Sequence, residues 1–392
     1  MMDRLSPRKI LEKLVSFPTV SSDTNLPLID WVENYLRSHG IETFRHLHEL
    51  DPRKAAVFAH VGPKEVGAVV LSGHTDVVPV EGQPWNSDPF EVVERDGKLF
   101  GRGTCDMKGF NALAIWILVE AHYAGVIRPL QLALSYDEEI GCTGAPPLIE
   151  NMSAVLPKGS AVIVGEPSMM GAVTGHKGGT GFHVHVRGYE VHSSIMHTGA
   201  NAIMYGVKLI DWANKMNTTN SAKEPTGADA MFDPPWTTLH VGRIEGGTAH
   251  NITALDCRFG LDFRFIPGDS PEKWKDQTRS RVAEIEAEMQ TVVPETYIEL
   301  GETYGVPALR PEEDGEAEQI VRRLTGDNAS RVVSYGTEAG HFQNAGYSAV
   351  ICGPGDIAQA HQPDEFLSVE QFEMGRAFMC KLLAMLRDDE GV

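Results

Sequence analysis

The pattern of apolar residues along the chain predicts a domain in which strands and helices alternate. Four short apolar runs, each of a length that fits a buried strand, end in polar residues, at 68–76, 130–139, 160–166 and 347–355. A helical run from Lys108 to Ala124 lies between the first two. Because buried strands that alternate with helices form parallel sheets covered on both faces, we expect an α/β domain with a mixed, mostly parallel sheet.

Helices are predicted at both ends of this domain. Ser6 and Pro7 have the residue types of a helix cap and first turn, and the apolar residues that follow share one helical face. A second helix is expected at about 28–38, ending before Gly40. A last helix is expected from about Val369 to Arg387.

The pattern changes at Gly178 to an alternation of apolar and polar residues. The first such strand has three apolar residues on one face and His183 and His185 on the other, which we interpret as a solvent-facing side. After it we expect a helix at 201–215, strands at 237–244 and 257–265, a second helix from residue 270 and a strand at 296–300. This order is typical of a ferredoxin-like α+β fold. We therefore expect residues 178–300 to form an inserted domain, and residues 1–177 with 301–392 to form the main domain.

Composition and charge exclude several classes of protein. The 392 residues carry 34 Lys and Arg against 54 Asp and Glu, a net charge of −20, which repels phosphate groups. We therefore expect neither nucleic acid nor a membrane as a partner. The longest apolar stretch, 112–119, is far shorter than a membrane span, and the first residues lack the apolar segment of a secretory signal. The five cysteines are widely spaced without a CxxC pair, so we expect no disulfide framework and a cytoplasmic location.

Side chains that bind metals follow the predicted strands. The first apolar run ends in His74 and Asp76, and the second in Glu138 and Glu139. Three further candidates follow a strand or lie in a glycine-flanked turn, namely Glu166, His361 and Asp106. Ligands bind in such folds at the carboxyl ends of the strands, and histidines with carboxylates suit Zn²⁺, Co²⁺ or Mn²⁺. Each residue alone would more simply belong to a turn, but their repetition at several strand ends favours a metal site.

Spacing suggests roles within this set. Asp76 lies two residues after His74, so its carboxylate can fix the tautomer of a metal-binding imidazole. Adjacent Glu138 and Glu139 cannot point the same way in an extended segment, so one can bind metal while the other acts as general base. A carboxylate shared between two metals would need the tight turn that Asp106 occupies.

Other motifs and residues are less specific. The segment GRGTCD has Asp106 where a dinucleotide-binding motif needs its third glycine, and neither a phosphate-binding loop nor a serine-hydrolase elbow occurs. In the inserted domain His192, Asn251 and Arg264 lie at strand ends or turns. They are candidates for substrate contact, and Arg264 could hold a carboxylate with two parallel hydrogen bonds, but ordinary turn residues would look the same.

Together these motifs resemble the two-metal aminoacylase, carboxypeptidase and deacylase family, and within it the acetylornithine deacetylases. The resemblance spans nearly the whole chain and rests on the segments SGHTDVVP, GRGTCDMKG, DEEIG, GEP, HKG, VHSS, DFRFIPG, YGTEAG, GPG and AHQPDE. It implies two divalent metal ions, Zn²⁺ with Co²⁺ as an alternative. One would be bound by His74, Asp106 and Glu166, and the other by Asp106, Glu139 and His361, with a cis peptide bond after Asp106.

The resemblance also implies a reaction. A metal-bridged water would attack the acyl group of a small N-acyl amino acid, with Glu138 as general base and Asp76 as the orienting carboxylate. The inserted domain would form a homodimer and act as a lid, and His192 would reach the partner's active site. Substrate contacts would come from Asn251, Arg264 and Gly353.

The substrate itself is open among several acylated amino acids. Glu338 could pair with the free amine of N2-acetyl-L-ornithine, which favours deacetylation of that compound in arginine biosynthesis. The residues Gly340 and His341 that follow depart from the usual acetylornithine deacetylase pattern. The alternatives are a succinyl-diaminopimelate desuccinylase, a general N-acyl-amino-acid deacylase, and a non-catalytic relative that serves as a binding or scaffold protein.

Overall fold

A computed structural model describes residues 3–388 and divides the chain into two compact units. The first unit comprises the described residues up to Gly175, Leu309–Arg331, and the described residues from Thr337 onward. The second comprises His176–Ala308 with Val332–Gly336. The first unit is α/β and the second is α+β, which confirms the expected fold class.

The first unit is built on a six-stranded sheet with the order β1-β2-β6-β3-β7-β15. In chain order these strands are β1 (Thr43–Leu47), β2 (Ala55–Val61), β3 (Ala68–His74), β6 (Leu130–Ser135), β7 (Gly159–Pro167) and β15 (Ser348–Gly353). Strands β6, β3, β7 and β15 run parallel, while β1 and β2 are antiparallel to their neighbours. Every residue of β3 and β6 is buried, as their unbroken apolar character predicts for central parallel strands.

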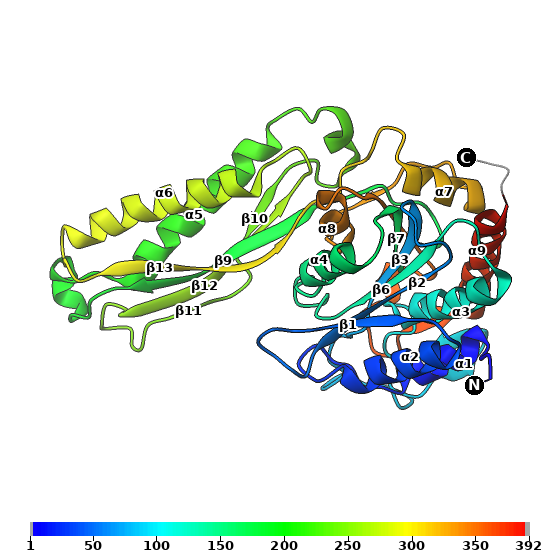
Figure 1. Cartoon of the computed structure of the whole chain (residues 1–392). Coiled ribbons are helices and arrows are strands. Elements are labelled where there is room, and N and C mark those ends of the chain that lie inside the picture. The colour runs from blue at the N-terminus through cyan, green and yellow to red at the C-terminus, as the bar shows by residue number, and fades with distance from the viewer. Residues whose placement is uncertain (1–2, 389–392) are drawn as a thin grey trace. The chain divides into compact units, whose positions relative to one another are not determined.

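Helices cover both faces of this sheet (Figure 1). On one face lie α1 (Pro7–Val15), α2 (Leu26–Ser38), α3 (Lys108–Ala124), α7 (Glu316–Thr325) and α9 (Val369–Arg387), which share one apolar core. The other face carries α4 (Ala145–Val155) and α8 (Ala339–Asn344). The predicted cap of α1 is present, because the Ser6 hydroxyl accepts a hydrogen bond from Lys9 N. Within residues 3–388, none of the helices is both long and apolar enough to cross a membrane.

Short strands and a short helix make up the rest of the first unit, and further short strands lie where the chain passes from one unit to the other. Strands β4 (Val93–Arg95), β5 (Lys98–Phe100) and β16 (Phe366–Ser368) form a small antiparallel sheet beside the turn that leads into α3. A short helix, η3 (Ile357–Gln359), precedes His361. Strand β8 (Gly175–His176) lies where the chain leaves the first unit, and β14 (Val332–Val333) lies in the second passage between units.

The second unit is a ferredoxin-like sheet with the strand order β10-β12-β9-β13, to which β11 adds beside β12. Its elements are β9 (Gly178–Arg187), η1 (Ser193–Thr198), α5 (Ala202–Ser221), η2 (Gly227–Met231), β10 (Thr238–His240), β11 (Ile244–Gly246), β12 (Asp256–Phe265), α6 (Pro271–Gln290) and β13 (Tyr297–Val306). Both long helices lie on one face of the sheet (Figure 1). The alternation predicted for β9 is confirmed, since Phe182 and Val184 are buried and His183 is exposed.

Two expected elements differ from the structure. The segment predicted as one strand at 237–244 is split into β10 and β11, which pair with separate parts of β12. Strand β13 does not end at residue 300 but continues along β9 to Val306 after an irregularity between Glu302 and Gly305. Glycine and polar residues at 301–305 hid this extension, because they interrupt the apolar alternation on which the sequence prediction depended.

Candidate metal centre

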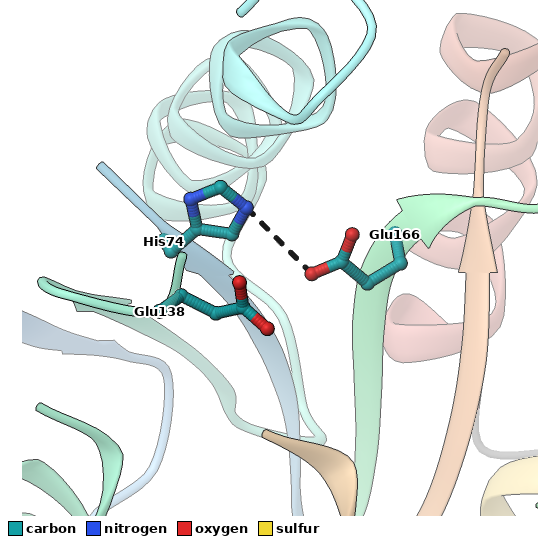
Figure 2. Close-up of side chains that lie close together, drawn as sticks. All are labelled: His74, Glu138 and Glu166. Atoms are coloured by element: carbon teal, nitrogen blue, oxygen red, sulfur yellow. Dashed lines mark ion pairs between the residues drawn. The ribbon is translucent and has the colours of Figure 1, made fainter. Parts of the chain in front are cut away.

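Three neighbouring strands bring the candidate ligands to one edge of the first unit's sheet. His74 is the last residue of β3, Glu166 lies near the end of β7, and Glu138 and Glu139 follow β6. Because β3 pairs in parallel with both β6 and β7, the carboxyl ends of all three strands meet. Figure 2 shows His74, Glu138 and Glu166 pointing toward one another from these three places.

Asp106 lies at the centre of the cluster, in the turn before α3. Its Oδ1 atom is 3.0 Å from His74 Nε2, and its Oδ2 atom is 3.3 Å from His361 Nε2. The two oxygens of one carboxylate therefore face two different imidazoles. This is the arrangement that a carboxylate shared between two metal ions requires. The expected cis peptide bond between Asp106 and Met107 is present.

The remaining carboxylates fall on two sides of Asp106. Glu166 Oε1 lies 3.7 Å from His74 Nε2, and Glu139 Oε2 lies 3.0 Å from His361 Nε2. The ligand atoms of His74, Glu138 and Glu166 lie within 4.8 Å of one another, as do those of His74, Asp106 and Glu139. Because Glu138 belongs to the first of these groups, its carboxylate is a candidate metal ligand as well as a candidate general base.

The turn after β6, rather than an extended strand, separates the two adjacent glutamates. Asp137 has a φ of 54°, which reverses the chain just before them. As a result Glu138 faces His74 and Glu166, whereas Glu139 faces His361. The expectation that the two side chains diverge agrees with this geometry, although the physical reason is the turn.

Burial, together with the crowding of carboxylates, raises the pKa values of several acidic side chains in the site. Burial, with the neighbouring carboxylates adding to its effect, raises the pKa of Glu138 to about 8 and the pKa of Glu139 to about 7. Burial and the Asp106 carboxylate raise the pKa of Glu166 well above its usual value. Hydrogen bonds to Asp106 and Glu139 raise the pKa of His361 to about 10. Negative charge in this buried space therefore needs a positive partner.

A divalent cation fits this donor set. The carboxylate atom Glu166 Oε1 is buried and has no hydrogen-bond partner among the described residues. Histidine nitrogens and carboxylate oxygens are the ligands that zinc and related ions prefer. A cation held among them would neutralise carboxylates that otherwise repel one another.

The environment of His74 selects the tautomer that metal binding needs. His74 Nδ1 lies 2.9 Å from the backbone carbonyl oxygen of Asp76 and 3.6 Å from its carboxylate. Since a carbonyl oxygen can only accept, Nδ1 carries the proton and Nε2 is left free to bind a metal. The backbone carbonyl of Asp76 thus lies closer to His74 Nδ1 than does the Asp76 carboxylate, which the sequence suggested as the orienting group.

Comparison with known proteins decides the family. A sequence profile described as peptidase family M20/M25/M40 matches residues 70–385, which include all the candidate metal ligands. The chain belongs to this family. It is 34% identical over 381 residues to an acetylornithine deacetylase from Myxococcus xanthus, with 96% of each chain covered. As a member of the M20 family with such relatives, it is a metal-dependent hydrolase.

Solved M20 structures have the same fold. A metallo-carboxypeptidase from Sulfolobus solfataricus superposes with a TM-score of 0.77 at 16% identity, covering 98% of this chain and 99% of that one. A dinuclear metal-binding peptidase from Bacillus subtilis superposes with a TM-score of 0.66 at 15% identity, covering 97% of each chain. At these identities the likeness concerns the fold alone.

Glu338 is placed differently from the sequence-based expectation. It is 0% exposed, and its two carboxylate oxygens accept hydrogen bonds from the hydroxyls of Ser72 and Ser135, at 2.8 and 2.7 Å. Burial raises the pKa of Glu338. Both oxygens are thus bound by hydroxyls of β3 and β6, contacts that favour a structural role for Glu338 over the pairing with a substrate amine suggested by the sequence.

Gly353 also has a packing role in the structure. A side chain there would lie 2.0 Å from the carbonyl oxygen of Gly165, and its own N–H donates to the Ser168 hydroxyl. The close approach of β15 to β7 requires glycine at this position. The sequence could not distinguish this requirement from substrate contact.

Three predicted substrate contacts belong to the second unit. His192 and Asn251 are exposed, and His192 Nδ1 accepts a hydrogen bond from the N–H of Ser194. The guanidinium of Arg264 donates to Asp262 and Tyr304, at 3.0 Å each, and the whole Arg264 side chain is 41% exposed. All three side chains are open to a ligand of the second unit.

Sequence reasoning missed two buried ion pairs that lie beside the candidate ligands. Arg102 and Glu365 form a fully buried ion pair beside Asp106, and Lys54 pairs with Asp137 beside Glu138. Arg102 and Glu365 lie within two of the quoted motifs, GRGTCDMKG and AHQPDE. The available signal was that each of these two motifs contains a charged residue to which no role had been assigned.

Proposed function

We propose that the protein removes the acetyl group from N2-acetyl-L-ornithine to give L-ornithine and acetate. The observation that carries this proposal is the position of Asp106, whose two oxygens face His74 and His361. The likeness to acetylornithine deacetylases over nearly the full chain supports the choice of substrate. The enzyme would act in the cytoplasm, in arginine biosynthesis.

Two divalent ions, Zn²⁺ or Co²⁺, are the proposed cofactors. His74, Asp106 and Glu166 would hold one, and Asp106, Glu139 and His361 would hold the other, because their facing atoms lie 3.0–3.7 Å apart. When bound, such ions polarise a carbonyl group and lower the pKa of water.

Glu138 is the proposed general base and acid. Its carboxylate is not hydrogen-bonded to either proposed histidine ligand, and the thiol of Cys142 donates to its Oε1 atom. Glu138 would take a proton from the attacking water and deliver it to the nitrogen of the leaving amine. Asp76 would support this role, since its carboxylate binds the backbone of the turn that carries Glu138.

The second unit would bind the substrate carboxylate and form a homodimer. Arg264 would offer its guanidinium to a carboxylate, since its side chain is 41% exposed, and Asn251 is exposed. Exposed apolar side chains on α5 and β11, Met204, Val207 and Ile244, are a suitable dimer surface. Because Nδ1 of His192 accepts from Ser194, its Nε2 carries the proton and could donate to a substrate oxygen in the partner's site.

Hydrolysis assays test this proposal. Metal-loaded enzyme would be given N-acetylornithine, N-succinyl-diaminopimelate and N-acetylmethionine in parallel, beside the Glu138→Ala variant. We expect strong preference for N-acetylornithine, lost in the variant. Preference for another substrate would retain the chemistry and identify a desuccinylase or general deacylase. Absence of activity on all three despite bound metal would favour a binding or scaffold protein.

A further inference from the structure

A fully buried ion pair lies directly behind the candidate metal centre. Arg102, in the turn between β5 and α3, donates to Glu365 at 2.7 Å, and each side chain is 1% exposed. Glu365 immediately precedes β16, which pairs with β5. Burying two charges is costly, so such a pair needs further hydrogen bonds to offset the loss of water.

The second carboxylate oxygen of Glu365 binds the backbone that carries Asp106. Its Oε1 atom accepts from the N–H groups of Cys105 and Asp106, at 2.9 and 3.1 Å. One carboxylate therefore binds Arg102 on one side and two consecutive amides on the other. This contact fixes the main chain at the residue that faces both histidines.

Arg102 reaches the loop that carries His361. Its guanidinium donates to the carbonyl of Gln362 at 3.3 Å and to the side-chain oxygen of Gln83 at 2.6 Å. The amide of Gln83 in turn donates to the carbonyl of His361 at 3.0 Å. His361 has a φ of 64° and a side chain that is 52% exposed, so these bonds hold its loop from behind.

The other histidine does not need such support. His74 lies within β3, where it pairs with Ser135 of β6, and Glu166 lies within β7, next to the pairing of Pro167 with Gly353 of β15, so the sheet fixes the main chain there. Asp106 and His361 lie outside the strands, in a turn and a loop. The buried pair supplies the fixed backbone that the sheet does not reach.

We infer that Arg102 and Glu365 are positioning residues for Asp106 and the His361 loop, and therefore act chiefly on the proposed metal site formed by Asp106, Glu139 and His361. This inference rests on the metal centre of the proposed function but not on the substrate. Loss of the pair should weaken the ion held by His361 most, because that site loses the support of both Asp106 and the His361 loop. The ion held by His74 and Glu166 should weaken less, because it shares only Asp106.

Metal titration of the metal-free protein tests the inference. Zn²⁺ would be added in competition with a chromophoric chelator to wild type, Glu365→Gln and Gln83→Ala. Glu33→Gln is the matched control, because Glu33 is a buried carboxylate paired with Arg37 and Arg45 outside the ligand set. Circular dichroism and thermal unfolding would show that each variant is folded.

We expect wild type and Glu33→Gln to bind two ions per chain. Glu365→Gln should bind the ion on the His361 side about 10- to 100-fold more weakly, the loss that is typical when a residue supporting a metal ligand is changed. The ion on the His74 side, which shares only Asp106, should weaken by a smaller factor. Gln83→Ala, which removes only a partly exposed link, should weaken the ion on the His361 side by less than Glu365→Gln does. If Glu365→Gln did not fold, Gln83→Ala would decide the matter.

Other outcomes would overturn the inference. Equal affinities in all four proteins would show that the pair does not position a ligand. Equal weakening of both ions in a folded variant would show that its effect is not greater on the His361 side. Selective weakening in a protein that hydrolyses none of the acylated amino acids would leave this inference standing and remove the proposed function.

Discussion

The carboxylate of Asp76 accepts a hydrogen bond from the backbone N–H of Glu138, with 3.1 Å between the two atoms. The second oxygen of Asp76 accepts from the N–H of Glu139 at 3.2 Å and from the Ser21 hydroxyl at 2.7 Å. A residue that follows β3 thus holds the turn that follows β6. Asp76 thereby connects the orientation of His74 to the position of the proposed general base.

Substitution of Asp76 should slow the reaction without removing the substrate site. In Asp76→Asn one acceptor oxygen is replaced by an amide that faces N–H donors, so the turn with Glu138 must shift. We expect kcat on N-acetylornithine to fall about 10- to 100-fold with little change in KM. Asp51→Asn, at a partly exposed position outside the ligand set, serves as control, and an unchanged kcat for Asp76→Asn would contradict the role of this contact.

The two adjacent glutamates should respond differently to the same substitution. Glu138→Gln removes the proposed proton acceptor, so kcat should fall about 10²- to 10⁴-fold while both ions remain bound. Glu139→Gln weakens the set that includes His361, so it should lower the metal content. Rate and metal content of the purified variants check this. Loss of metal in Glu138→Gln would make Glu138 a ligand, in the group with His74 and Glu166.

Metal binding should stabilise the fold by relieving repulsion among buried carboxylates. A chelator should lower the melting temperature by several degrees, and added Zn²⁺ should restore it, since an ion at 100 times its Kd contributes about 2.7 kcal/mol. Glu166→Gln should reduce the response to Zn²⁺, because burial disfavours the charge of Glu166 and the ion offsets that cost. Equal melting curves with and without chelator would argue against a metal centre.

The lowered pKa of the buried His341 side chain should make the stability of the fold depend on pH. Burial lowers the pKa of His341 to about 4, against 6.5 for an ordinary histidine, and its Nε2 atom has no hydrogen-bond partner among residues 3–388. Between about pH 6.5 and pH 4 the unfolded chain binds a proton there that the folded chain does not. The free energy of unfolding should therefore fall as the pH falls, by about 1.4 kcal/mol per unit of pKa difference.

Comparison of His341→Phe with wild type measures this contribution. Urea unfolding at several pH values from 4 to 7.5 should show a shallower loss of stability in the variant. His183→Phe, at an exposed position of β9, is the matched control. Parallel pH profiles of wild type and His341→Phe would show that His341 does not titrate in this way.

Glu338→Gln separates a structural role from substrate binding. Because Glu338 is bound by Ser72 and Ser135 inside the sheet, the variant should lower the melting temperature and change the KM for N-acetylornithine less than about threefold. A tenfold or larger rise in KM, absent for N-acetylmethionine, would instead restore Glu338 as the partner of the ornithine amine.

Local patterns were sufficient to predict much of the fold and the chemistry of the site. The helix predicted from Lys108 to Ala124 has those bounds in the structure, because its apolar run and the glycine after it depend only on neighbouring residues. The candidate ligands could be found for a similar reason, since a residue that directly follows a buried strand must lie at the sheet edge. The family resemblance then added roles that spacing alone left open.

Contacts between distant segments were decided only by the tertiary structure. Nothing in the sequence indicates that Glu365 binds Arg102, 263 residues away, or that both oxygens of Glu338 are taken by hydroxyls on β3 and β6. Burial and hydrogen-bond partners depend on which strands become neighbours, and the order β6-β3-β7 is not the order of the chain. The residue types thus determined which chemistry was available, while packing determined which side chains are free to perform it.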